Sequence, residues 1–220
     1  MRSSLAFAVI AAAASARFAV GQEPSAPRTD ERLSERALQD REIVYFLQPP
    51  EAHAFDLYHD YTESRAGVDR YLNVVRKGSR ASNPSAILLD TGARLPAETL
   101  RGDAIARAGL DIGEQVRPDS EVVVIRFPAV ERGRSVRLRI SETYMDEKSY
   151  RLEGDELVFD RSFGRPRNAV VLPADWYLTA CAIPATVSET ADGRIRLDFA
   201  NPRPDEIAVL IRAKRRPGSR

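Results

Sequence analysis

The feature that most constrains the fold is a series of short segments rich in β-branched and aromatic residues, most of them ended by Gly, Pro, Asn or Asp. Such segments are typical of strands, because these side chains fit a pleated surface and the turn residues let the chain reverse. In residues 53–61, Phe55, Leu57 and Tyr61 recur on one face. Further strands are expected over residues 43–47, 70–76, 86–90, 121–127, 135–143, 156–163, 169–172, 176–183, 194–199 and 206–213.

One helical segment interrupts the strands. Residues 99–109 contain several alanines and end in Gly109, a residue typical of a helix end. Asp192-Gly193 predicts a hairpin turn. Many short strands with one short helical insertion predict an all-β protein, a β-sandwich of immunoglobulin-like or related type, over residues 42–213. The absence of linker-like composition after residue 41 favours one domain, and two small sandwiches divided near Pro118 are the alternative.

The N-terminal segment has the three parts of a secretory signal peptide. Met1-Arg2-Ser3-Ser4 is basic, residues 5–14 are apolar, and Ala14-Ser15-Ala16 matches the pattern that signal peptidase reads. We therefore expect a signal peptide over residues 1–16, with cleavage after Gly21 as the alternative, and a secreted or periplasmic protein. Residues 17–41 are expected to form a linker, of which residues 30–40 could form a short helix, and residues 214–220 a basic tail. No further apolar stretch is long enough to span a membrane.

Charge and cysteine content exclude two classes of protein. The 33 basic and 32 acidic side chains leave a net charge of +1, whereas a dedicated nucleic-acid binder shows a strong basic excess. The single cysteine, Cys181, excludes an intramolecular disulfide framework, so packing alone must stabilise the fold. We expect Cys181 to be a small buried residue on a strand.

One motif could carry catalytic chemistry. Two leucines, Leu88 and Leu89, are followed by Asp90-Thr91-Gly92 and an alanine. This sequence resembles the active-site loop of aspartic peptidases, whose chemistry needs two carboxylates that share one proton. The chain has no second motif of this kind, so the catalytic interpretation requires a dimer. The other interpretation is a tight turn, in which Asp and Gly are the expected residues.

The two histidines are candidate metal ligands. An extended strand places His53 and His59 on one face, where Glu51 or Glu63 could join them. A zinc site needs a third or fourth ligand, so the other interpretation is a pair of packed or hydrogen-bonded histidines. Because no complete zincin, phosphate-loop, dinucleotide or serine-hydrolase motif occurs, we expect no metal and no cofactor.

Three short motifs follow one another in a defined order. Pro50-Glu51-Ala52-His53 opens a strand, residues 90–95 form a turn of Asp-x-Gly-x-x-Leu type, and Leu172-Pro173-Ala174-Asp175-Trp176 opens a late strand. In this order they resemble the N-terminal all-β domain of glycyl-aminopeptidase-type metallopeptidases, over residues 42 to about 185. The resemblance implies the non-catalytic sandwich of that family, because the helical domain that carries the zinc ligands is not in this sequence. It also implies that Asp90 is a turn residue.

Together these observations favour an exported, non-catalytic interaction or accessory module that binds a protein or glycan partner in the cell envelope. The dimeric aspartic peptidase and the metal-binding domain are the alternatives. The best candidate contact residues lie in two places. Asp56, Tyr58 and Asp60 are exposed positions of the strand that contains the histidines, and Arg76 and Arg80 belong to the loop after the following strand.

Expression with the native N-terminus in an exporting host is expected to yield a mature chain that begins at Arg17, which intact-mass measurement and N-terminal sequencing check. Ala16→Phe places a large ring where signal peptidase needs a small side chain, and is expected to block or shift cleavage. A chain that begins at Gln22 would instead place the cut after Gly21. An exported protein that retains Met1 would contradict the signal-peptide assignment.

Overall fold

The computed structural model describes residues 41–203 and 205–218. The expected signal peptide, the linker up to residue 40 and the helix expected over residues 30–40 lie outside the described residues. Within the described ranges, no helix has both the length and the apolar character needed to cross a bilayer.

Strands make up most of the described chain. Two short helices accompany them in the described ranges: the 3-10 turn η1 (Pro50–Ala52) and α2 (Asp103–Arg107). The strands are β1 (Arg41–Leu47), β2 (Ala54–Glu63), β3 (Arg70–Val74), β4 (Arg80–Leu88), β5 (Arg94–Leu95), β6 (Ala97–Arg101), β7 (Glu121–Arg126), β8 (Val136–Met145), β9 (Tyr150–Glu153), β10 (Glu156–Phe163), β11 (Arg167–Val171), β12 (Trp176–Cys181), β13 (Thr186–Glu189), β14 (Ile195–Ala200) and β15 (Ile207–Arg215).

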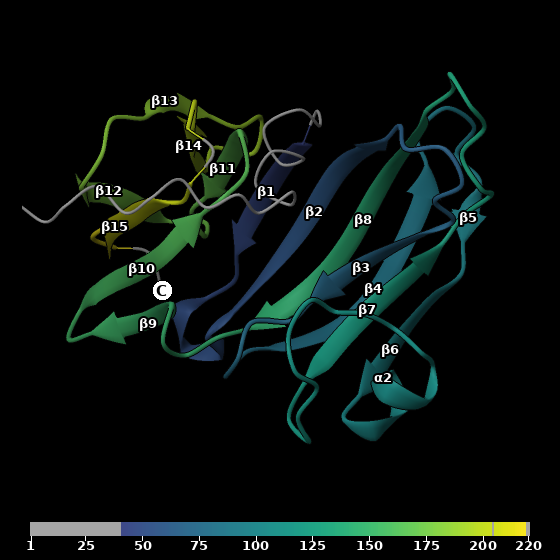
Figure 1. The fold of residues 1–220 in the computed structure, drawn as a ribbon. Helices are drawn as coiled ribbons and strands as arrows, with labels where there is room; N and C mark the ends of the chain where they lie inside the picture. Colours follow the sequence, from purple (N-terminus) through teal and green to yellow (C-terminus); the bar gives the residue numbers. More distant parts are fainter. Residues whose placement is uncertain (1–40, 204, 219–220) are drawn as a thin grey trace, which may run out of the picture.

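The described strands form three sheets (Figure 1). The large sheet has eight strands in the order β13-β14-β11-β1-β2-β8-β4-β5, and only β1 and β11 pair in parallel. A four-stranded sheet, β12-β15-β10-β9, lies against its β11–β1 half, and a three-stranded sheet, β3-β7-β6, lies against its β8–β4 half (Figure 1). The predicted all-β, sandwich-like architecture is confirmed.

The main core lies between the large sheet and the two smaller sheets. Alternation along β2 directs Phe55 and Tyr61 inward, and both side chains are almost completely buried. Tyr45 from β1 and Phe159 from β10 meet the same cluster from opposite layers. The main core is therefore continuous across all three sheets.

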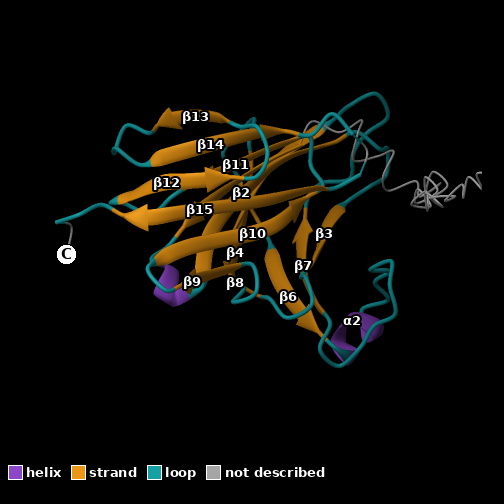
Figure 2. Cartoon of the chain, turned by 90° about the vertical axis from the view of Figure 1, so that its left-hand side faces the viewer, coloured by secondary structure: helices purple, strands orange, loops and turns teal. Residues whose placement is uncertain are grey.

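A second, smaller core lies on the other face of the three-stranded sheet. β7 is buried on both faces: Val123 and Ile125 enter the main core, whereas Val122 and Val124 pack against Ile105 of α2. Figure 2 shows α2 beside the end of β6. Burial on both faces explains why the sequence of β7 is an unbroken apolar run and not an alternating pattern.

The helix expected over residues 99–109 is only partly present. Residues up to Arg101 continue β6, which pairs with β7, and the helix spans Asp103–Arg107 alone. Gly102, with a φ of 46°, separates the two elements. Strand pairing with the buried β7 outweighed the local helix preference of the alanine-rich segment, which is the usual result when propensity and tertiary pairing compete.

Residues 80–85, which precede the strand expected over residues 86–90, form the first part of β4. The strand pairs with β8 across a register shift between Ser82 and Ser85, and Asn83 takes a positive φ of 52° inside it. A bulge of this kind takes up the extra residues, so this polar, turn-like segment can still pair with β8 on both sides of it. At the C-terminal end, β15 continues through Arg215, so Lys214 and Arg215 belong to the sheet and not to a tail.

Phe159→Ala is expected to lower the free energy of unfolding by about 3–5 kcal/mol, because it removes a fully buried ring and leaves a cavity between two sheets. Urea denaturation of the mature chain measures this loss. Val187→Ala, at a side chain that is 52% exposed, is the matched control and should stay within about 0.5 kcal/mol of the wild type. Equal losses in both variants would contradict the assignment of Phe159 to the core.

Candidate functional site

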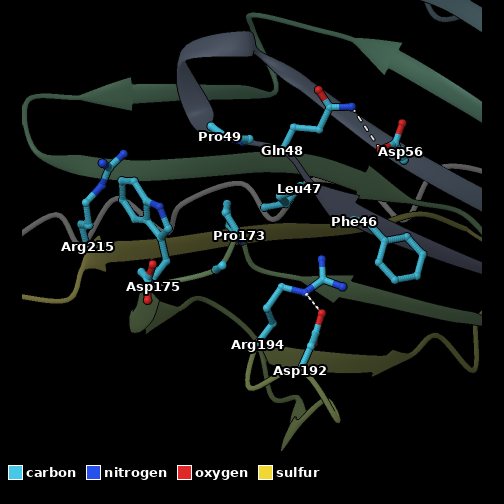
Figure 3. A pocket seen from close by; sticks show the side chains of 12 residues that line it. Phe46, Leu47, Gln48, Pro49, Asp56, Pro173, Asp175, Asp192, Arg194 and Arg215 are labelled. Atoms are coloured by element: carbon cyan, nitrogen blue, oxygen red, sulfur yellow. Dashed lines mark hydrogen bonds and ion pairs between the residues drawn. The ribbon is translucent and has the colours of Figure 1, made fainter. Parts of the chain in front are cut away.

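A pocket with a volume of about 650 Å³ opens at one end of the sandwich. It lies where β1 runs into η1, where β11 connects to β12, and where β13 turns into β14. Figure 3 shows that the side chains converge on this opening from all three segments. The lining residues are Phe46, Leu47, Gln48, Pro49, Asp56, Pro173, Ala174, Asp175, Trp176, Asp192, Arg194 and Arg215.

The centre of the pocket is apolar. Leu47 ends β1, and Pro173 follows β11, so both project near the middle of the opening (Figure 3). Asp175 takes a positive φ of 65°, which turns the chain sharply before Trp176 starts β12. This turn is what brings the tryptophan back to the end of β1.

Two arginines cover the aromatic side chains of the pocket. The guanidinium of Arg215 lies 5.3 Å from the ring centroid of Trp176, and that of Arg194 lies 5.8 Å from the ring centroid of Phe46. Arg215 also pairs with Glu51 at 3.2 Å, and Arg194 with Asp192 at 2.8 Å. A ring contact and an ion pair thus place each of the two arginine side chains at the rim.

Two carboxylates complete the rim. Asp56 accepts hydrogen bonds from Gln48 Nε2 at 3.1 Å and from the Thr143 hydroxyl at 2.7 Å. Neither Asp56 nor Asp175 has an ion-pair partner in the described parts of the chain. The rim therefore combines acceptors, donors and charges of both signs around an apolar centre.

The contact residues predicted from the sequence are only partly brought together. Asp56 lines the pocket, while Tyr58 and Asp60 lie farther along the same outward face of β2. Asp60 binds Arg139 through two hydrogen bonds of 2.7 Å, and the Arg139 guanidinium lies 4.1 Å from the Tyr58 ring.

The two arginines of the prediction lie elsewhere. Arg76 follows β3 and lines a second pocket, and Arg80 is the exposed first residue of β4. The serine-rich segment between Arg80 and β5 is a strand, so the expected contact loop around Arg76–Arg80 is reduced to the turn that joins β3 to β4.

Most of the pocket was not found from the sequence. Arg194 and Asp192 belong to the hairpin that Asp192-Gly193 predicts, and Trp176 belongs to the Leu-Pro-x-x-Trp motif, but neither pattern indicates that the two segments meet. The available signal was the presence of a solitary tryptophan directly after a turn.

Asp90 lies at the tip of the turn between β4 and β5. The Gly92 amide donates to the Leu88 carbonyl at 2.7 Å, and the Ala93 amide donates to the Thr91 hydroxyl at 3.2 Å. The Asp90 side chain is 57% exposed and pairs with Arg137 at 3.3 Å. These are the contacts of a tight turn, one of the two interpretations that the motif allowed.

The two histidines have separate partners. His53 caps η1 with a φ of 50°, and its Nδ1 lies 3.0 Å from the Tyr150 carbonyl oxygen. His59 is buried on β2, with its Nδ1 3.2 Å from the Tyr71 hydroxyl. In the described parts of the chain, no three His, Cys, Asp or Glu side chains gather closely enough to hold a metal ion.

A buried carboxyl group lies where the three-stranded sheet meets the large sheet. Glu142 is 3% exposed and accepts a hydrogen bond from Asn73 Nδ2 at 2.7 Å, while its Oε1 has no partner among the described residues. Burial raises the pKa of Glu142 to about 7, with a further increase from the charge of Glu121, although the Asn73 hydrogen bond acts in the opposite direction. No residue that lines the 650 Å³ pocket hydrogen-bonds to Glu142, whereas Asn73, its hydrogen-bond partner, lines the second pocket.

Neither a family model nor a curated protein matches this chain. Among solved structures, an M1 zinc metallopeptidase from Deinococcus radiodurans is similar over 79% of this chain and 41% of its own length, with 13% identity and a TM-score of 0.45. An aminopeptidase N family protein from Idiomarina loihiensis is similar over 78% of this chain and 29% of its own length, with 12% identity and a TM-score of 0.41. The resemblance to part of a metallopeptidase, which the sequence motifs predict, is thus found. This chain spans less than half of the length of these solved proteins.

Glu142→Gln is expected to flatten the dependence of stability on pH. The folded-state pKa of about 7 lies above the ordinary value of 4.5, so the folded wild type binds its proton more tightly and loses stability as the pH rises through this window. Relative to the Glu142→Gln variant, the free energy of unfolding of the wild type should fall by roughly 2–3 kcal/mol between pH 4.5 and 8. Urea denaturation at both pH values measures this difference.

The matched control is Glu147→Gln, which removes a carboxylate from an exposed position near the end of the same strand. It should keep the pH dependence of the wild type. If Glu142→Gln and Glu147→Gln gave the same slope, Glu142 would not be the titrating group.

Proposed function

We propose that this protein is an exported, non-catalytic binding module that holds a glycan segment in the pocket at the end of its sandwich. The observation that carries the proposal is the 650 Å³ pocket, which joins an apolar centre to a rim of carboxylates and arginines. Its volume falls in the range of about 300–1,000 Å³ that is usual for ligand pockets.

The chemistry of the pocket fits a sugar. A sugar ring presents C–H groups on its faces and hydroxyl groups at its edge, so it needs an apolar centre and a polar rim. Asp56 and Asp175 can accept hydrogen bonds from hydroxyl groups, whereas Gln48 and Arg194 can donate to them. Arg215, Arg194 and Asp56 already contact Glu51, Asp192 and Thr143, respectively, so these three side chains lose less conformational freedom on binding.

A protein partner fits this pocket less well. A stable protein interface buries about 800 Å² on each side and is centred on exposed anchor residues. In the pocket, Trp176 is only 5% exposed and lies beneath Arg215. The concave shape therefore favours a ligand that enters between the side chains over a surface that rests on them.

Export is the second part of the proposal. Its support is the basic, apolar and small-residue pattern of residues 1–16. The single cysteine leaves no intramolecular disulfide to form, so folding after export needs no oxidation step. A cell-envelope location would bring the pocket into contact with surface and wall glycans.

The tryptophan provides a direct test, because Trp176 is the only tryptophan in the chain and lines the pocket. Titration of the mature protein with a panel of chitin, cellulose and peptidoglycan oligosaccharides is expected to change its fluorescence in a saturable manner. Asp56→Asn and Arg194→Gln should each weaken binding about tenfold, equivalent to ~1.4 kcal/mol. Asp90→Asn, an exposed turn residue outside the pocket, is the control and should leave the affinity unchanged.

Two results would overturn parts of the proposal. If no oligosaccharide changed the fluorescence while a peptide library did, the ligand class would be wrong. If the protein released reducing ends from a bound oligosaccharide, or cleaved peptides in an Asp90-dependent manner, the module would not be non-catalytic.

A further inference from the structure

A second, smaller pocket of about 150 Å³ lies where the three sheets meet. Tyr144 and Asn168 reach it from the large sheet, Arg161 from the end of β10, and Asn73 from β3. It is therefore a gap between the four-stranded and the three-stranded sheets, above the large sheet that both cover. Its lining is mainly polar, unlike that of the neighbouring core.

Asn168, one of the lining residues, has an acceptor without a partner among the described residues. Its side chain is 2% exposed, and its Nδ2 donates to the Arg165 carbonyl at 2.9 Å. The Oδ1 atom is buried and has no hydrogen-bond partner among the described residues. A buried acceptor without a partner costs free energy, so this position favours a ligand that brings a hydrogen-bond donor.

Arg161 supplies donors to the same pocket. It is 8% exposed, and its Nη1 donates to Asp146 at 2.9 Å. The rings of Phe55 and Tyr144 lie 5.2 and 5.7 Å from its guanidinium and hold it in place. Since a guanidinium carries five N–H donors, the Asp146 contact leaves others for a ligand.

The charges around the pocket match a ligand with a single negative charge. Arg76 and Arg165 line it together with Arg161, and Glu206 is the acidic residue of the lining. Asp146 neutralises Arg161, and Glu206 can offset one of the other two arginines, which leaves one positive charge. A carboxylate carries one negative charge, whereas a phosphate monoester carries nearly two at neutral pH.

We propose that this pocket is a second ligand site, which binds a small carboxylate that carries a hydrogen-bond donor on the neighbouring carbon, as in an α-amino acid or the C-terminal residue of a peptide. The carboxylate faces the donors of Arg161, Arg76 and Arg165, and the neighbouring N–H group donates to Asn168 Oδ1. The site is independent of the glycan pocket, which shares none of these residues.

Isothermal titration calorimetry of the mature chain with a matched ligand series tests this assignment without disturbing the fold. N-acetylglycine contains both groups, N-acetylglycinamide lacks the negative charge, and propionate lacks the donor. We expect N-acetylglycine to bind at least about tenfold more tightly than either of the other two. Glycine distinguishes the sources: tighter binding of glycine indicates a free amino acid, and tighter binding of N-acetylglycine indicates the end of a peptide chain.

Two surface variants separate the site from general electrostatic attraction. Arg76→Gln removes a lining charge from an exposed side chain and should weaken N-acetylglycine binding several-fold, because it deletes one of the carboxylate donors. Lys77→Gln removes the same charge from the adjacent exposed residue, which does not line the pocket, and should leave binding unchanged. Equal affinities for N-acetylglycine and its amide, equal losses in both variants, or no saturable heat up to tens of millimolar ligand would each overturn the proposal.

Discussion

Contacts between aromatic rings of opposite layers are the interaction on which the rest of the structure depends. Tyr45 stacks on Phe163 with ring centroids 5.1 Å apart, and Phe55 meets Phe159 edge-on at 5.8 Å. Tyr45 and Phe55 come from the large sheet and the two other rings from β10, so the cluster fixes the distance between the layers. Such pairs add about 0.5–1.5 kcal/mol each beyond the burial of their surface. The strands that supply these rings, β1, β2 and β10, also contribute lining residues to the two pockets.

Both pockets follow from covering one wide sheet with two narrower ones. The 650 Å³ pocket forms around Leu47 and Pro173, between the large sheet and the β12 and β15 strands of the four-stranded sheet. The smaller pocket lies between β3 of the three-stranded sheet and β10 of the four-stranded sheet, and polar side chains, among them Asn168, line most of it. The fold therefore contains one site with an apolar centre and one with a mainly polar lining.

Two buried glutamates, Glu63 and Glu142, lie on the paired strands β2 and β8, and their pKa values shift in opposite directions. Burial would raise the pKa of Glu63, but hydrogen bonds from Arg65 and Tyr61 outweigh it and hold the pKa at about 2. This group stabilises the folded state above its ordinary pKa and loses that effect as the pH falls toward 2. Glu142 has no cation beside it, so burial dominates and raises its pKa to about 7. The difference lies in the partners that the fold supplies, because both are glutamates on neighbouring strands.

The sequence by itself determined the strands whose side chains alternate or are buried on both faces, such as β2 and β7, and the hairpin turn at Asp192-Gly193, because these patterns depend on neighbours in the chain. It also placed Asp56 on an exposed face. Tertiary structure decided that residues 99–101 pair as a strand, because the partner β7 lies about twenty residues away in the chain. It likewise decided that Trp176, Arg194 and Phe46 share one pocket, and that Asn168 and Arg161 share another. Local patterns record which face of an element is buried, but they contain no information on which distant elements that face will meet, since sheet order is set by packing among all the layers at once.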